Sequence, residues 1–424
     1  MNLPHDPALP QLATALDEAA MCEAFAAARP DAGIVACRVD RIKYRPQRNA
    51  SISYRLDLHD GGQQIVAARL CSSDDALRRA RRDGPASGAL HLPALDMVAW
   101  FWPADAKLRA PRVLADPALL CEQVLPALLP PGARLLAFRV DVVQYVPESR
   151  LCARVHLHSA AGEQVLYAKS SREPAGDEAH RILQALHGRA GLRVPRPLCW
   201  QSAFELHWQQ AVPGRALLDL LPEQQAALAP ELGAQLAALH GTPVAITREL
   251  TPAVLLERLR DVHDVLHAAL PAARDTLRAL VARLAAGVDT WAGAHLATLH
   301  GDLHPRNVLA DGEALSLIDL DGLRRGPAVL ELGSWRADAI YRAVLEGRDP
   351  AHDEAAWQAL LAGYAAAGGT RPRAGALAWA CAWNLLTQRA WRCVVNLKPG
   401  RFAIAPRLVA LAADMAAAPL QEAA

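Results

Sequence analysis

The residues with the clearest capacity for chemistry lie in one stretch of 26 residues, ATLHGDLHPRNVLADGEALSLIDLDG, from Ala297 to Gly322. Within it Asp302 is followed by Asn307 five residues later and by Asp319 another twelve residues on. Transfer of a phosphoryl group needs hard oxygen ligands for Mg²⁺ and a carboxylate that orients the attacking hydroxyl. One Asp for the acceptor and an Asn/Asp pair for the metal are the smallest set that meets this need.

The pattern HGDLHPRN followed by LIDLDG resembles the catalytic and metal-binding loops of kinases. With Gly before the first Asp, it is similar to the aminoglycoside phosphotransferase and choline kinase family. The resemblance implies an α+β, protein-kinase-like two-lobed fold with a β-rich N-lobe and a helical C-lobe. It also implies transfer of the γ-phosphate of ATP or GTP to a hydroxyl of a small metabolite or antibiotic. By this matching Asp302 is the catalytic base, and Asn307 and Asp319 hold Mg²⁺.

A kinase-like N-lobe also needs a lysine on its third strand and a glutamate on the helix that follows. The sequence VLYAKSS places Lys169 at the end of an apolar strand, and DEAHRIL places Glu178 nine residues later in a predicted helix. Lys169 is one of only four lysines in the chain, which favours a specific role. Gln209, Gln210 and Ala211 resemble the family's hinge, which would bind adenine through its backbone.

A weak repeat, offset by 99 to 101 residues, covers the front half of the chain. Residues 38–70 and 139–171 share Arg-Val-Asp, a Tyr four residues after the Asp and a Pro two residues after the Tyr. Each copy predicts strand, loop, strand, turn, strand. The first copy has Arg69 where the second has Lys169, so we expect it to be a degenerate N-lobe-like module without its own active site. The expected parts are an N-terminal module (1–130), a kinase-like N-lobe (131–212) and a helical C-lobe (213–424).

Several residues near these motifs leave alternatives open. Arg306 either reaches phosphate or faces solvent, and Asp321 is either a second metal-shell group or a surface carboxylate. Glu331 stands where many relatives have an Asp that braces the catalytic loop, and we expect it to keep that role. The loop Tyr145–Arg150 takes the place of a Gly-rich phosphate loop but contains no glycine.

Other readings of the same residues compete with the kinase reading. His300, Asp302 and His304 form an H-x-D-x-H cluster of the metallohydrolase kind, although no further ligands cluster with it. Trp379 and Trp383, four apart on one helical face, either pack in a core or hold a quaternary ammonium, as choline kinases do. As whole functions, a nucleotide-binding pseudokinase or assembly protein and a maltokinase-type sugar kinase are the alternatives.

The composition excludes few classes of protein, but it argues against nucleic acid and membrane lipids as partners. The 424 residues carry 45 Lys and Arg against 44 Asp and Glu, which gives no overall basic face for nucleic acid or membrane lipids. The eight cysteines have no CxxC spacing, and the longest apolar stretch, Gly375–Leu386, is too short to span a bilayer. We expect a cytoplasmic enzyme with a small hydroxyl acceptor as its partner, binding neither nucleic acid nor membrane.

Overall fold

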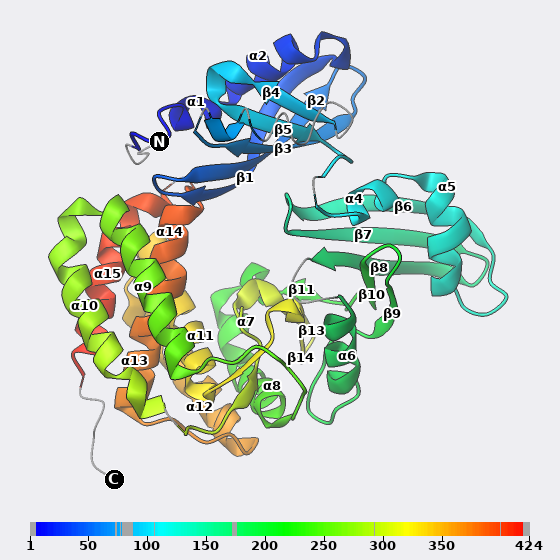
Figure 1. Cartoon of the computed structure of the whole chain (residues 1–424). Coiled ribbons are helices and arrows are strands. Elements are labelled where there is room, and N and C mark those ends of the chain that lie inside the picture. The colour runs from blue at the N-terminus through cyan, green and yellow to red at the C-terminus, as the bar shows by residue number, and fades with distance from the viewer. Residues whose placement is uncertain are drawn as a thin grey trace.

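The computed structural model describes residues 6–72, 74–76, 78, 88–105, 107–171, 176–291, 293–398 and 400–418. Two five-stranded antiparallel sheets come first along the chain, and a helical lobe follows them (Figure 1). The predicted α+β architecture, with a β-rich front and a helical rear, is therefore confirmed.

The first sheet is covered on one side by a helix whose aromatic side chain enters the sheet's core. Phe25 packs edge-on against Tyr54 and Phe101, with ring centroids 5.2 and 6.0 Å away. Asp17 caps this helix by accepting hydrogen bonds from the next turn. The strand order is β1-β2-β3-β5-β4. The elements are α1 (Leu12–Ala15), α2 (Glu18–Ala28), β1 (Ile34–Arg45), β2 (Asn49–Leu58), β3 (Gln63–Leu70), β4 (Ala89–Leu92) and β5 (Met97–Phe101).

The second sheet repeats the first in topology, with strand order β6-β7-β8-β10-β9. Short helices α4 (Ala110–Leu114) and α5 (Pro117–Leu119) connect the two sheets, and α6 (Gly176–Leu186) follows the third strand of the second. The repeat read from the sequence thus corresponds to two sheets of the same order. Its strands are β6 (Leu135–Val146), β7 (Arg150–Ser159), β8 (Gly162–Ser171), β9 (Pro197–Gln201) and β10 (Leu206–Gln210).

The two copies also share a set of hydrogen bonds at the turn between their first two strands, in which an aspartate accepts from a tyrosine hydroxyl and from a backbone amide. In the first copy, Asp6 accepts hydrogen bonds from the Tyr44 hydroxyl (2.7 Å) and the Gln47 amide (2.8 Å). In the second, Asp105 accepts from the Tyr145 hydroxyl and from the amide of Glu148. Gln47 and Glu148 both adopt left-handed backbone, with φ of 57° and 58°. Equivalent contacts of this detail support duplication more strongly than the sequence matches do.

The helical lobe contains two cores. One lies among the long helices α9, α10, α11, α13 and α15, and the other lies between α8, α12 and the hairpin β13–β14. Gly233 lets α8 touch α12, since a Cβ there would lie 2.1 Å from the Leu360 carbonyl oxygen. The elements are β11 (Arg215–Ala216), α7 (Pro222–Ala227), α8 (Ala229–Gly241), α9 (Pro252–Ala269), α10 (Arg274–Ala286), β12 (Ala297–Leu299), β13 (Val308–Asp311), β14 (Ala314–Leu317), β15 (Arg324–Gly326), α11 (Ala328–Leu345), α12 (Glu354–Ala366), α13 (Ala374–Asn384), α14 (Trp391–Val395) and α15 (Arg401–Ala416).

Two details of the helical lobe differ from the sequence patterns. The run EQQAALAPELGAQLAALHG reads as one helix, but it divides at Leu228 into α7 and α8, because Pro230 favours the first turn of a new helix. A π-helical turn, Leu385–Ala390, joins α13 to α14 in the middle of an apolar segment. Such turns change the register of the side chains that follow them.

The first sheet contacts both other parts of the molecule. Leu397, which follows α14, is buried in the core of the first sheet with Tyr44 and Met97. On its other side, Trp100 of β5 shares a core with the second sheet, and Trp102 packs edge-on against Tyr145 at 5.6 Å.

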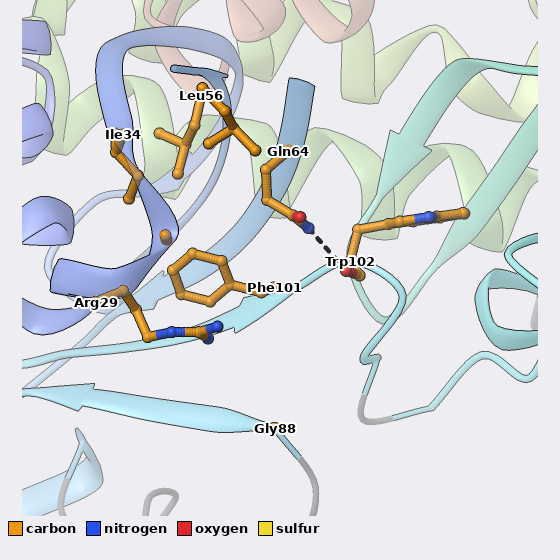
Figure 2. Close-up of a pocket in the computed structure, with 9 residues that line it drawn as sticks. Arg29, Ile34, Leu56, Gln64, Gly88, Phe101 and Trp102 are labelled. Atoms are coloured by element: carbon orange, nitrogen blue, oxygen red, sulfur yellow. Dashed lines mark hydrogen bonds between the residues drawn. The ribbon is translucent and has the colours of Figure 1, made fainter. Parts of the chain in front are cut away.

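A cavity of about 270 Å³ opens in the first sheet. It lies among apolar side chains, with Arg29 stacked over the Phe101 ring and Gln64 hydrogen-bonded to the Trp102 carbonyl (Figure 2). Across the described ranges, no helix has the length and apolar character needed to cross a membrane.

Candidate active site

The hairpin β13–β14 sets the separation of the predicted catalytic residues. It pairs Val308 with Leu317, and the Ile318 amide donates to the Asn307 carbonyl at 2.9 Å. Gly312 makes the turn with φ of 60°. The hairpin brings the catalytic segment (residues 300–307) beside the acidic segment (residues 317–322).

Gly301 allows these two segments to touch. Its φ is 79°, and a Cβ at this position would lie 2.2 Å from the carbonyl oxygen of Gly322. Only glycine satisfies both conditions without strain. His300, which is fully buried, adds a second link by donating from Nε2 to the Ile318 carbonyl at 2.9 Å. This close approach is the physical reason for Gly in HGD.

Glu331, in the first turn of α11, braces the catalytic segment as expected. Its carboxylate accepts from the backbone amides of His300 (2.9 Å) and Gly301 (2.8 Å) and from Nε2 of His240 (3.0 Å). Nδ1 of His240 in turn lies 2.9 Å from the Tyr364 hydroxyl. Burial alone would raise the pKa of Glu331, but the hydrogen bonds and charges of His240 and His300 lower it. The buried carboxylate is therefore ionised, and its two oxygens accept hydrogen bonds from the catalytic segment and from His240.

Asp302 forms an ion pair that the sequence did not predict. Arg392 of α14 places Nη2 2.9 Å from Asp302 Oδ1. Burial would raise the pKa of Asp302, but Arg392, His304 and Arg389 outweigh burial and hold it well below its usual range. Asp302 is consequently a carboxylate at all ordinary pH values.

Lys169 lies at the centre of the acidic segment. Its Nζ is 2.8 Å from Asp319 Oδ1 and 3.1 Å from both oxygens of Asp321. Burial would lower the pKa of Lys169, but the two carboxylates raise it above its ordinary value. Asp319 adopts left-handed backbone with φ of 60°, a costly conformation for Asp that clusters at functional sites. Asp321 is thus a partner of Lys169 rather than an isolated surface carboxylate.

Glu178 has a different partner from the predicted one. Its Oε1 accepts from the Thr247 hydroxyl at 3.0 Å and from the Thr247 amide at 3.3 Å, which links α6 to the helical lobe. Within the described ranges, Lys169 and Glu178 form no ion pair. The role of Glu178 in gripping the nucleotide therefore stays a prediction.

Two residues of the predicted hinge, Gln209 and Gln210, lie in strand β10, and Ala211 follows the strand directly. The amide of Gln210 donates to the Arg196 carbonyl, and that of Ala211 donates to the Val165 carbonyl, both at 2.9 Å. The side chain of Gln209 is buried. These amides help to build the sheet, so adenine recognition by Gln209, Gln210 and Ala211 stays a prediction.

The oxygen atoms near Lys169 are of the type that Mg²⁺ prefers. Asn307 donates from Nδ2 to the Asp302 carbonyl at 3.0 Å, which leaves its Oδ1 as the atom suited to a metal. Asp319 and Asp321 add carboxylate oxygens, which both contact Nζ of Lys169. In the part of the chain that is described, no group of three or more His, Cys, Asp or Glu side chains has the geometry of a metal site. The H-x-D-x-H reading therefore gains no support, and His304 instead accepts from the Arg306 amide at 3.3 Å.

The other residues that the sequence left open lie in different environments. Arg306 is exposed. Trp379 donates to the Leu284 carbonyl within the helical core, whereas Trp383 lines a small cavity beside Asp302. In the loop Tyr145–Arg150, Glu148 pairs with Arg69 (3.7 Å) and Lys107 of the preceding part of the chain. The Arg at the position of Lys169 therefore contacts the loop that replaces the phosphate loop.

The sequence reading missed Arg389 and Arg392 as residues of the site. They are the only charged residues between Ala374 and Val395, and they are three apart. Two arginines on one face of an otherwise apolar helix were a usable signal, because buried charges are rare without a specific partner.

Comparison with known proteins gives one family and a set of distant structures. The sequence profile of the "Phosphotransferase enzyme family" matches residues 153–377, more than half of the chain. Comparison with curated proteins gives no significant match.

Among solved structures, a macrolide 2'-phosphotransferase from Brachybacterium faecium is 20% identical, with a TM-score of 0.44, covering 69% of this chain and 96% of that one. A choline kinase from Streptococcus pneumoniae is 12% identical, with a TM-score of 0.49, covering 69% and 98%. A thermostable mutant of an aminoglycoside phosphotransferase, in ternary complex with ADP and hygromycin B, is 14% identical, with a TM-score of 0.47, covering 68% and 96%.

Proposed function

Because the chain belongs to the phosphotransferase enzyme family, we propose that it transfers the γ-phosphate of ATP to a hydroxyl group of a small molecule, with Asp302 as the base. The observation that carries the proposal is the convergence of Lys169, Asp319 and Asp321 within 3.1 Å, next to a catalytic segment that holds Asp302 and Asn307. These residues come from both lobes, 150 positions apart in the case of Lys169 and Asp319. This site supplies one cation, Lys169, for phosphate, and carboxylate and amide oxygens for a metal.

The family implies a magnesium ion, and the residues present fit it. Asn307 and Asp319 would hold it, with Asp321 as a further oxygen donor, and few side-chain ligands beside phosphate oxygens are the usual Mg²⁺ site. When bound, Mg²⁺ neutralises charge on the β- and γ-phosphates. Lys169 contributes a fixed positive charge for the same phosphates.

Asp302 orients the acceptor and receives its proton. In the structure Arg392 engages Oδ1 of Asp302. When the acceptor is bound, a carboxylate oxygen of Asp302 accepts a hydrogen bond from the acceptor hydroxyl. The acceptor oxygen forms a bond to the γ-phosphorus, the bond to the β,γ-bridging oxygen breaks, and the proton passes to Asp302. The transition state of phosphoryl transfer is loose, so a base of low pKa suffices when it positions the nucleophile well.

The test is transfer of labelled phosphate from ATP to a panel of hydroxyl acceptors by the wild-type chain and by Asp302→Asn. We expect the variant to lose about 10²–10⁴-fold in kcat while keeping a cooperative unfolding transition, because the side chains have the same shape. Asp275→Asn, at an exposed position of α10, is the matched control and should keep full activity. Unchanged turnover in Asp302→Asn would refute the role of Asp302.

A nucleotide-binding protein without transfer is the second candidate, and two contacts favour it. Asp302 is paired with Arg392, and Lys169 is paired with Asp319 rather than with Glu178. Such a protein would bind Mg-ATP but phosphorylate no acceptor. Calorimetric binding of ATP together with an inactive acceptor panel would select it over the kinase.

A further inference from the structure

One wall beside Asp302 is built from the segment Ala374–Val395, which contains α13, the π-helical turn and α14. Its two charged residues, Arg389 and Arg392, both lie at the catalytic aspartate, and Arg392 contacts it directly. The π-helical turn ends at Ala390, between the two arginines. Arg258 of α9 fixes this wall by stacking on Trp391 at 4.1 Å and donating to the Thr387 carbonyl at 2.7 Å.

A cavity of about 30 Å³ lies between this wall and the catalytic segment, with Asp302, Arg324, Trp383 and Arg389 among its lining residues. Trp383 is 4% exposed and Arg389 is 6% exposed. Among the described residues, Trp383 Nε1 and Arg389 Nε have no hydrogen-bond partner. Buried donors normally find a partner, so two of them at one cavity require an acceptor atom there, and a volume of about 30 Å³ admits only a small acceptor group.

The carboxylates around this cavity are already occupied. Asp338 is shared by Arg342 (3.0 Å) and Arg389 (3.2 Å). Glu331 accepts three N–H groups of the catalytic segment and His240, as described above. Arg324 hydrogen-bonds the Gly322 carbonyl, and no carboxylate pairs with it among the described residues. Three guanidinium groups, those of Arg324, Arg389 and Arg392, therefore gather around Asp302 and this cavity, and the neighbouring carboxylates already have partners.

Building on the proposed function, we propose that the acceptor is an anionic alcohol, whose carboxylate or phosphate group binds Arg392 together with Arg324 and Arg389. An anionic oxygen group forms bidentate, charge-assisted hydrogen bonds with guanidinium groups. It competes with Asp302 for Arg392, and this releases the catalytic carboxylate to face the acceptor hydroxyl. A polycationic acceptor would meet like charge at the same wall.

This arrangement makes Arg392 a specificity residue and a switch of Asp302. An alcohol without an anionic group leaves the Arg392–Asp302 pair intact and gains nothing from the wall. An alcohol with an amine adds a charge of the wrong sign. Recognition of the anion and release of the base are then one event, which favours the correct acceptor in both KM and kcat.

The experiment compares four small alcohols that share one carbon skeleton: glycerol, 3-amino-1,2-propanediol, glycerate and glycerol 3-phosphate. Binding to the full chain is measured by calorimetry with Mg²⁺ and a non-hydrolysable ATP analogue, and transfer is measured with ATP. We expect glycerate or glycerol 3-phosphate to bind at least ~10-fold more tightly than glycerol, the order expected for a charge-assisted hydrogen bond, and the amine to bind no better than glycerol. The stronger of the two anions identifies the group.

Variants connect the preference to the wall. Arg392→Gln should remove the preference for anions, and Arg392→Lys should restore part of it. Arg278→Gln, on the exposed face of α10, is the matched control and should leave it unchanged. Equal binding of all four alcohols, no detectable binding of any, or a preference that survives Arg392→Gln would overturn the proposal.

Different outcomes of this experiment would contradict the kinase function and the anion site. A preference for anions in binding, without phosphate transfer in any arm, refutes the kinase and supports the anion site. Transfer to glycerol or to the amine at a rate equal to the anions supports the kinase and overturns the anion site.

Discussion

Gly301 controls how closely the catalytic and acidic segments approach each other. The two glycines 301 and 312 both have positive φ, yet only the first has backbone atoms within van der Waals reach of an added Cβ. Their substitution therefore separates steric contact from backbone conformation. The same pair shows which part of the HGD motif is structural and which part is chemical.

We expect Gly301→Ala to cost more than about 3 kcal/mol of unfolding free energy, because left-handed strain adds to a clash with a carbonyl. Gly312→Ala, with φ of 60° and no neighbour within 4 Å, should cost only about 1–2 kcal/mol. Urea denaturation of both variants checks the difference. Equal losses would mean that the contact with Gly322 is unimportant.

Arg392 also determines the pH dependence of Asp302. In the wild type the pKa of Asp302 is held low, so kcat/KM should show no acid limb from this group between about pH 5 and 8. Burial raises the pKa of Asp302, and Arg392 counteracts this effect. Arg392→Gln removes that counteracting charge, so the pKa of Asp302 rises. We expect an acid limb to appear between about pH 4 and 6 in the variant's profile.

The Arg392–Asp302 pair should also make the unfolding free energy of the protein depend on pH. A carboxyl group whose pKa is lower in the folded state stabilises the protein above its unfolded pKa, about 3.9 for Asp. That stability is lost as the pH falls through the lower, folded value. Denaturation of Arg392→Gln should therefore become less sensitive to acid below about pH 4, and an unchanged acid response would contradict the ion pair.

At the scale of elements, helix α11 supports the catalytic segment through its first turn. Glu331 lies near the positive end of the helix dipole and accepts three hydrogen bonds. Glu331→Gln replaces two acceptor atoms by one acceptor and one donor that faces other donors. We expect a loss of about 2–4 kcal/mol in unfolding free energy and a clear drop in kcat. Urea denaturation and the phosphate-transfer assay measure the two effects.

Glu354→Gln in α12 is the control for this change. Glu354 pairs with Arg336 at 2.6 Å but is half exposed, and exposed ion pairs contribute about 0–1 kcal/mol. A loss as large as that of Glu331→Gln would show that charge alone, rather than bracing of the loop, explains the effect.

The sequence predicted most elements near the site because their signals are local. The strand that carries Lys169 follows from a short apolar pattern, and the bracing role of Glu331 follows from the family resemblance. The pair Arg392–Asp302 joins residues 90 positions apart, and no local pattern specifies such a contact. The α7–α8 break lies at Leu228, and Pro230 two residues later was a signal available in the sequence, but the continuous apolar period of the segment concealed it.

At the scale of the whole molecule, the first sheet covers surfaces of both other parts. Its Trp100 and Val98 share a core with Tyr145 and Leu151 of the second sheet. The chain boundaries at 130 and 212 stay predictions, and this shared core makes the first of them testable. A truncated protein that lacks the first sheet would expose apolar surface of the second sheet.

We expect a truncated chain of residues 131–424 to be markedly less stable than the full chain, by more than about 5 °C in Tm, or to aggregate. Differential scanning calorimetry of both proteins measures this. The full chain with Asp302→Asn is a useful reference, since it changes the site without changing the interface. A truncated chain with an unchanged Tm would show that residues 131–424 form an independent unit.

The position of Leu397 has a consequence for biosynthesis. This residue completes a core whose last strand ends at Phe101, and it follows that strand by almost three hundred residues. At a translation rate of about 5–20 residues per second, the ribosome delivers Leu397 roughly 15–60 s after the sheet itself. The part of the protein that is made first is therefore among the last to reach its final packing, and in that interval a chaperone would find an incomplete apolar core.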